Sequence, residues 1–361
     1  MKVIRFALIN LIVFTLLLAG LNWVCGVYLR KASKPDRSEL PNYDADREHA
    51  RAVFADYNRV KHRYEPFVGW RTLPYEGKTT RISKQGRRIH NDANNGNNKP
   101  VVRFFGGSTM WGEGADDKHT IPALFNAMRP EYHVVNHGQL AYNTRQELDE
   151  LISIYTRDER ADVVIFYDGV NDAAFLCPTE IAELPAHRLV PMYREKLYTG
   201  KSAIVKGLVY EIFIDNIMAV IRNISHNPSA NSPYDCVSNP AKAEAIAEMM
   251  MRHWEMAHDL VTARDGVFLA VLQPAAYIGS PRTDHLELDE DLGANFHAIY
   301  DRLKTKIAER NHPWIIDLSQ QFNGDEYIFI DFCHVSPNGN AIIARQIADV
   351  ISDSLLMAKR R

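Results

Sequence analysis

The sequence has no excess of charge of either sign, and it contains few cysteines. Its 361 residues include 42 Lys and Arg against 45 Asp and Glu, so it offers no basic surplus for binding nucleic acid. The four cysteines, Cys25, Cys177, Cys236 and Cys333, are too few and too scattered for a disulfide scaffold or a structural zinc site. Hydrophobic residues make up 46% and charged residues 24%, which indicates a folded globular protein rather than a disordered or fibrous one.

Long apolar runs are absent except for one near the N-terminus, residues 6–27, which contains no charged residue. A helix of this length, at about 1.5 Å per residue, spans about 33 Å, enough for the core of a bilayer. Trp23 and Tyr28 lie at its end, where amphipathic rings suit the headgroup region. We interpret residues 1–30 as a membrane anchor, because the run is longer than that of a usual signal peptide. A cleaved signal peptide is the alternative, and a buried core helix comes last.

The charges that flank the apolar run give conflicting indications of its orientation. Two basic residues precede it and four follow it: Lys2 and Arg5 before, and Arg30, Lys31, Lys34 and Arg37 after. Positive residues prefer the cytoplasm, which argues against export of the C-terminal part. Single N-terminal spans usually act as signal-anchors, however, and on that ground we expect the C-terminal part on the periplasmic or extracytoplasmic side.

The rest of the chain divides by composition and pattern. Residues 31–98 are polar and interrupted by prolines, which predicts a juxtamembrane stalk and a small irregular or β-rich preface with paired short strands. In residues 99–361, short apolar runs alternate with amphipathic segments, as in a mainly parallel sheet with helices on both faces. The predicted strands are 101–106, 132–138, 161–169, 266–274 and 314–319, and the predicted helices are 143–158, 240–264, 289–310 and 337–356. The breaker-rich segment at about 175–239 is expected to be an insertion.

Polar residues follow the strands at the predicted carboxyl edge of the sheet, where ligands bind in open α/β folds. Ser108 follows the first strand, Gly138 ends the second and Asn171 follows the third, while Asp331 and His334 precede the last helix. A serine hydroxyl becomes a nucleophile beside a base, so we assign Ser108 as nucleophile, His334 as base and Asp331 as the acid that orients it. The backbone N–H groups of Ser108 and Gly138 and the side-chain amide of Asn171 are the predicted oxyanion donors.

Four short motifs in this order resemble the four blocks of the SGNH hydrolases, also called the GDSL esterase/lipase family. They are GGST at 106–109, NHG at 136–138, GVND at 169–172 and DFCH at 331–334. The resemblance covers about residues 101–355 and implies a flavodoxin-like three-layer fold, with the same five residues in the same roles. One departure is Gly107, because many members carry an aspartate there.

Other residues near these motifs have both a structural and a functional interpretation. Trp111 is either an aromatic wall that binds a sugar ring or acyl chain, or a packing residue. Asp168 and Asp172 are expected to fix loops by accepting backbone N–H bonds, and Cys333 is expected to be an inert, packed thiol. Metal-dependent hydrolysis is disfavoured because the histidines form no HExxH helix, so neither a metal nor another cofactor is expected.

The leading hypothesis is a membrane-anchored serine esterase that hydrolyses O-acyl, above all O-acetyl, esters of a cell-envelope or secreted glycan. Its partners would be the acylated glycan or another ester, and the membrane through residues 6–27. The chief alternative is an O-acyltransferase that uses the same acyl-enzyme. Further alternatives are a lipid ester or thioester hydrolase and a non-catalytic glycan-assembly protein. In an exported domain, Cys177 and Cys236 are able to pair across the insertion.

Overall fold

A computed structural model of the protein describes residues 2–31, 36–90, 99–187, 189–190, 209–225 and 234–351. The chain forms two compact units. One consists of Met1–Asp36 with Pro191–Ser232, and the other of Arg37–Val190 with Pro233–Arg361. The region expected as a preface is therefore part of the unit that contains the sheet. Much of the expected insertion belongs to the unit that contains the N-terminal helix.

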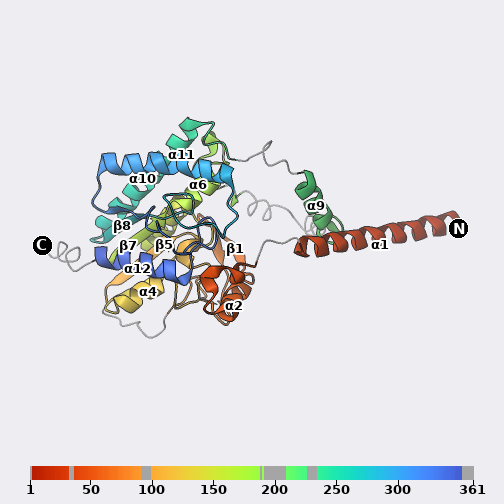
Figure 1. Cartoon of the computed structure of the whole chain (residues 1–361), viewed down its shortest axis with the longest axis horizontal. Helices are drawn as coiled ribbons and strands as arrows, with labels where there is room; N and C mark the ends of the chain where they lie inside the picture. The colour runs from red at the N-terminus through yellow and green to blue at the C-terminus, as the bar shows by residue number, and fades with distance from the viewer. Residues whose placement is uncertain are drawn as a thin grey trace. The chain divides into compact units, whose positions relative to one another are not determined.

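The larger unit is built on a five-stranded sheet in the order β6-β5-β7-β8-β9, in which all neighbouring strands are parallel (Figure 1). The strands are β5 (Val101–Gly106), β6 (His133–Asn136), β7 (Val163–Asp168), β8 (Val267–Leu272) and β9 (Ile315–Asp317). Each predicted strand is present, and the predicted three-layer α/β fold is confirmed. Because the chain moves from β5 to β6 on one side and then to β7 on the other, the carboxyl end of β5 is the switch point where such sheets bind ligands.

Helices cover both faces of this sheet (Figure 1). One face carries α5 (Thr144–Thr156), α6 (Val170–Leu176), α10 (Pro240–Thr262) and α11 (Glu290–Arg310), and the other carries α4 (Ile121–Met128) and α12 (Pro337–Val350). Phe105 and Phe166 belong to the apolar core on the first face, whereas Phe104 and Ile165 belong to the core on the second. Strands buried on both faces are apolar throughout, which explains the continuous runs seen in the sequence.

Residues 37–90 form a set of short elements. They are η1 (Arg37–Glu39), η2 (Pro41–Tyr43), α2 (Arg47–Tyr57) and two antiparallel pairs, β1 (His62–Glu65) with β2 (Gly69–Thr72) and β3 (Tyr75–Glu76) with β4 (Arg81–Ile82). The predicted paired strands are present, whereas α2, whose first turn is capped by the Asp46 side chain, was not predicted. Phe54 of α2 packs in a small core with Tyr43 and Ile330. This core brings the preface against the segment that contains Asp331.

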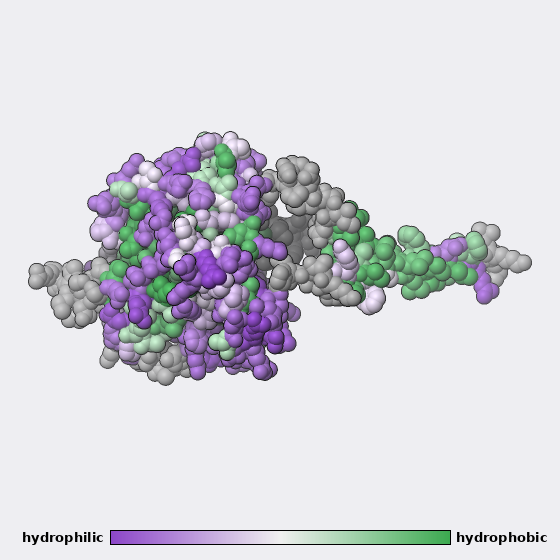
Figure 2. All heavy atoms as spheres, viewed as in Figure 1, coloured by the Kyte–Doolittle hydropathy of each residue, from purple (hydrophilic) through white to green (hydrophobic). Residues whose placement is uncertain are grey.

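The N-terminal helix α1 (Lys2–Lys31) contains the apolar run. An 18-residue window within Ile4–Leu29 has a mean hydropathy of 2.3, and the large apolar side chains along α1 are mostly exposed (Figure 2). Length and composition make α1 a candidate membrane anchor, although a signal sequence has the same properties. In the same unit, α9 (Asp215–Ser225) packs against α1.

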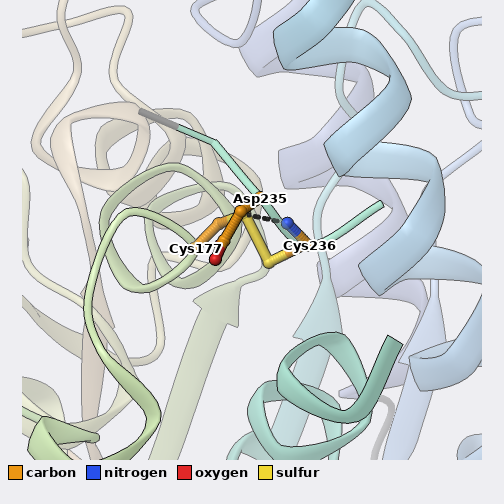
Figure 3. A group of neighbouring side chains, drawn as sticks. All are labelled: Cys177, Asp235 and Cys236. Atoms are coloured by element: carbon orange, nitrogen blue, oxygen red, sulfur yellow. Dashed lines mark hydrogen bonds between the residues drawn. A yellow bond between two sulfur atoms is a disulfide. The ribbon is translucent and has the colours of Figure 1, made fainter. Parts of the chain in front are cut away.

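Cys177 and Cys236 form a disulfide bond, so the pairing considered from the sequence is present (Figure 3). Cys177 follows the last residue of α6, and Cys236 lies shortly before α10. Asp235 lies beside the bond and pairs with Lys242 Nζ at 2.7 Å. Closing a loop of 59 residues reduces the entropy of the unfolded chain, which stabilises the fold by about 4 kcal/mol.

We expect the unfolded, unreduced protein to expose two free thiols, those of Cys25 and Cys333, and the reduced protein to expose four. Thiol labelling in denaturant followed by mass spectrometry measures both numbers. Reduction should also lower Tm by several degrees, because the unfolded chain regains the entropy of the loop. Four reactive thiols without reductant would contradict the pairing.

Candidate active site

The three residues predicted as a catalytic triad come together at the carboxyl edge of the sheet. Ser108 is the first residue of the short helix α3 (Ser108–Trp111), directly after β5, and it is 8% exposed. Its Oγ lies 2.7 Å from Nε2 of His334, which is also 8% exposed. The other ring nitrogen, Nδ1, lies 2.8 Å from Oδ2 of Asp331. This is the hydrogen-bond chain that a serine nucleophile needs.

Asp331 is held in place by the turn that contains it. Its Oδ1 accepts the backbone N–H groups of Cys333 at 2.9 Å and His334 at 2.8 Å. Burial raises the pKa of Asp331, but the charge and hydrogen bond of His334 and these two N–H groups outweigh burial and hold that pKa well below its usual range. The carboxylate is therefore ionised at neutral pH and fixes the proton of His334 on Nδ1.

Two charged residues that the sequence analysis did not assign complete this cluster. Arg37 Nη1 lies 3.0 Å from Asp331 Oδ2 and 2.8 Å from Glu113 Oε1. Glu113 Oε2 lies 3.1 Å from His334 Nε2, the same nitrogen that contacts Ser108. Arg37 and Asp331 are 294 residues apart, so no local pattern connects them. Arg37 entered the sequence analysis only as one of the basic residues that follow the apolar run.

These carboxylates affect the charge state of His334. Burial lowers the pKa of His334, but the negative charges of Asp331 and Glu113 raise it well above its usual value. Glu113 acts on the critical nitrogen, because Nε2 must be unprotonated to accept the proton of Ser108. An anion at 3.1 Å from Nε2 favours the imidazolium form, which is not a base.

Glu113→Gln should therefore shift the acidic limb of the pH profile of kcat/KM to lower pH by about one unit. Removing the anion lowers the pKa of His334, so the neutral, active imidazole persists at lower pH. The profile is measured with a p-nitrophenyl ester against Glu131→Gln, a control on an exposed surface glutamate. An unchanged limb, or one shifted to higher pH, would contradict this role for Glu113.

Asn171 lies near the start of α6, beside Gly107, the residue that precedes Ser108. Its Nδ2 donates to the carbonyl oxygen of Tyr142 at 2.6 Å, which fixes the plane of the amide. A Cβ at position 107 would lie 2.0 Å from this Nδ2, so a side chain there is incompatible with the amide in its present place. Gly107, the departure from the usual motif, is thus explained by the position of Asn171.

Gly138 has a different partner from the one predicted. Its N–H donates to Oδ1 of Asn136 at 2.8 Å, and this contact occupies the N–H that the sequence analysis assigned to the oxyanion. A Cβ at position 138 would lie 2.4 Å from the backbone nitrogen of Trp111. The close approach of two loops therefore accounts for the glycine.

Trp111 packs inside the protein, which is the structural alternative considered for it. It is 1% exposed, and the Arg88 guanidinium lies 4.4 Å from the centroid of its ring. A side chain this deeply buried does not form an open wall for a substrate. Burial likewise raises the pKa of Cys333 to about 12, which leaves a neutral, inert thiol as predicted.

Asp168, directly before the third motif, and Asp172, within it, both accept hydrogen bonds, although in different ways. Asp172 accepts the backbone N–H of Thr144 at 3.2 Å and its hydroxyl at 2.7 Å, so it fixes the start of α5 as expected. The Asp168 side chain instead accepts the indole N–H of Trp254 at 2.8 Å, which ties β7 to α10. Both contacts are structural supports behind the site.

Two groups of potential metal ligands occur in the part of the chain that the structure describes. They are Cys177, Asp235 and Cys236, and Asp331, Cys333 and His334. In the first group the two sulfur atoms are bonded to each other. In the second, the ring nitrogens of His334 contact Ser108 and Asp331. The donors of both groups are thus engaged within the protein.

No protein-family model and no curated protein sequence matches this chain. Similar solved structures include a member of the lipolytic G-D-S-L family from Veillonella parvula, with a TM-score of 0.39 and 11% identity over 70% of this chain and 97% of that one. Est24, a carbohydrate acetylesterase from Sinorhizobium meliloti, has a TM-score of 0.38 and 15% identity over 70% of this chain and 97% of its own. A GDSL-like lipase from Bacteroides thetaiotaomicron has a TM-score of 0.39 and 13% identity over 73% and 92%.

Proposed function

We propose that this protein is a serine esterase that hydrolyses O-acyl esters through an acyl-enzyme. The observation that carries the proposal is the buried chain from Ser108 Oγ to His334 Nε2, at 2.7 Å, and from His334 Nδ1 to Asp331, at 2.8 Å. Ser108 attacks the acyl carbon while His334 takes its proton, and the imidazolium then protonates the departing alcohol. Water activated by His334 releases the acid and restores Ser108.

The developing oxyanion needs donors close to Ser108. The Ser108 N–H is the first of α3 and has no acceptor within that helix, and Asn171 has a second amide hydrogen besides the one bound by Tyr142. Of the three donors predicted from the sequence, we assign Ser108 and Asn171 to this role, whereas the Gly138 N–H binds Asn136.

For the substrate, we propose an O-acetylated glycan of the cell envelope or a secreted glycan. A cavity of about 370 Å³ lies between α2 and the loops that follow Glu113 and His334. Asp46, His49 and Asp116 line this cavity and hydrogen-bond to one another, while Ser108 is not among its lining residues, so the cavity adjoins the site and is not the site itself. The disulfide supports an extracytoplasmic catalytic unit, because such bonds persist in oxidising compartments.

The test is acetate release by the full-length protein in detergent, from p-nitrophenyl acetate and from acetylated oligosaccharides, beside its Ser108→Ala variant. Activity that requires Ser108 on both substrates supports the proposal. Activity on the p-nitrophenyl ester but not on the acetylated oligosaccharides would support the esterase chemistry and contradict the glycan substrate. Inactivity in water that is overcome by adding a sugar acceptor would replace hydrolysis by acyl transfer, and activity that survives in Ser108→Ala would overturn the assignment.

A further inference from the structure

Asn22, in the middle of the apolar C-terminal half of α1, is buried although most of its helix is exposed. Its side chain makes four hydrogen bonds to the backbone of residues 211–217. Nδ2 donates to the carbonyl oxygens of Glu211 and Ile212, both at 3.0 Å. Oδ1 accepts the N–H groups of Asn216 at 2.9 Å and Ile217 at 3.3 Å.

These four contacts repair a break in a helix. Residues 209–213 are helical, Ile214 is a turn, and α9 continues from Asp215. In an uninterrupted helix, the Asn216 N–H would donate to the Ile212 carbonyl. Here both groups bind the Asn22 amide, which is inserted between them. Backbone groups freed at a break in a helix require such a partner in hydrocarbon, where no water is available.

The face of α1 that carries Asn22 is shaped for a close helix neighbour. Gly26 lies one turn further on, and a Cβ there would lie 2.9 Å from Nδ2 of Asn216. Small residues allow this close approach between membrane helices. Most of the protected positions of this half of α1 recur at helical spacing and form one stripe, which contains Leu18, Ala19, Asn22, Cys25, Gly26 and Leu29; Val27 lies outside it.

The partner segment also carries apolar side chains that this unit leaves uncovered. Val209 and Ile212 are each 46% exposed. The large apolar side chains on the other faces of α1 are exposed as well (Figure 2). The segment is amphipathic rather than wholly apolar, because the exposed Glu211 and Asp215 lie among its apolar residues. A helix of this composition, fastened alongside a membrane span, suits the boundary between acyl chains and headgroups. Since Asn22 is seven residues before Leu29, the attachment lies about 10 Å inside the end of the apolar run.

We infer that residues 209–225 are an amphipathic partner of α1 at the membrane interface, held by Asn22, with the apolar side chains against lipid acyl chains and the charged ones toward the headgroups. It follows that α1 is a retained anchor rather than a cleaved signal peptide, because cleavage would remove the partner of four backbone groups. The insertion is then a second attachment of the catalytic unit to the bilayer. This inference does not depend on the esterase chemistry.

The test uses the full-length protein in vesicles of phosphatidylcholine and phosphatidylglycerol, with an environment-sensitive fluorophore on Val209→Cys in a Cys25→Ser background. Met256→Cys is the matched control, because Met256 is an exposed apolar residue of α10 in the other unit. Nitroxide-labelled lipid should quench the probe at position 209 several-fold more strongly than the probe at position 256. Equal quenching would overturn the inference, whether the segment faces water or a second copy of the chain.

The role of Asn22 is tested with Asn22→Leu, which keeps the span apolar and removes the four contacts. Quenching at position 209 should fall toward the Met256 value. Asn10→Leu makes the same chemical change in α1 where the amide bonds only within its own helix, to the Phe6 carbonyl, and should leave quenching unchanged. Unchanged quenching in Asn22→Leu, or a membrane-extracted protein whose mass lacks residues 1–30, would contradict the inference.

Discussion

His334→Ala should lower kcat/KM for p-nitrophenyl acetate by about 10⁵-fold or more, the scale seen when the histidine of a serine triad is removed. Two functions are lost together, because the same Nε2 accepts the proton of Ser108 and returns it to the departing alcohol. The residual rate should also lose the acidic limb of its pH profile. That limb reports the protonation of His334, and no imidazole remains at the site.

The fold should survive this change because one cation still bridges the two carboxylates. Arg37 pairs with Asp331 and with Glu113 once the imidazole is removed. Comparison of Tm with the parent protein checks this, and His297→Ala, on the exposed side of α11, serves as the matched control. A variant that folds normally and keeps more than a hundredth of the parent activity would show that His334 is not the base.

The architecture follows from the sequence because two periodicities are clear in it. The strands are buried on both faces and read as apolar runs, while the helices between them are apolar on one side only. The start of a helix is also predictable from the sequence. Asn143, expected to begin a helix, forms a capping box with Gln146 in which each side chain bonds the other residue's backbone N–H.

The charged surroundings of the triad were not predictable in the same way. Arg37 reaches Asp331 only because Tyr43 of η2 and Phe54 of α2 pack with Ile330, a tertiary contact between the two ends of the unit. Glu113 lies five residues after Ser108, yet its contact with His334 depends on the turn that ends α3. Sequence spacing identifies residues that share a turn or a sheet edge, but it does not identify which distant residues pack against them.

The predicted oxyanion donors show a second limit of what can be inferred from the sequence. Gly138 stands where a backbone donor was expected, but the chain uses its N–H to bind Asn136 and uses its missing side chain to approach Trp111. A glycine in a loop signals that the backbone needs space or an unusual conformation. It does not show whether a ligand or another loop fills that space.

Asn171→Ala should lower kcat by about 10²- to 10³-fold with little change in KM, because an oxyanion donor acts on the transition state and not on the bound ester. The split between kcat and KM separates this role from simple packing, which would alter binding or Tm. Steady-state kinetics and thermal unfolding measure both. A loss confined to KM would contradict the assignment of Asn171 as an oxyanion donor.

Gly107→Ala offers an independent route to the same result, since the added Cβ would lie 2.0 Å from Asn171 Nδ2 and must displace the amide. It leaves every polar group of the triad in place, so its effect on kcat should resemble that of Asn171→Ala. Because both changes remove one donor, the double variant should be no worse than the slower single variant. If the loss of kcat in the double variant equals the product of the two single losses, Gly107 and Asn171 act on different steps, and the amide does not stabilise the oxyanion.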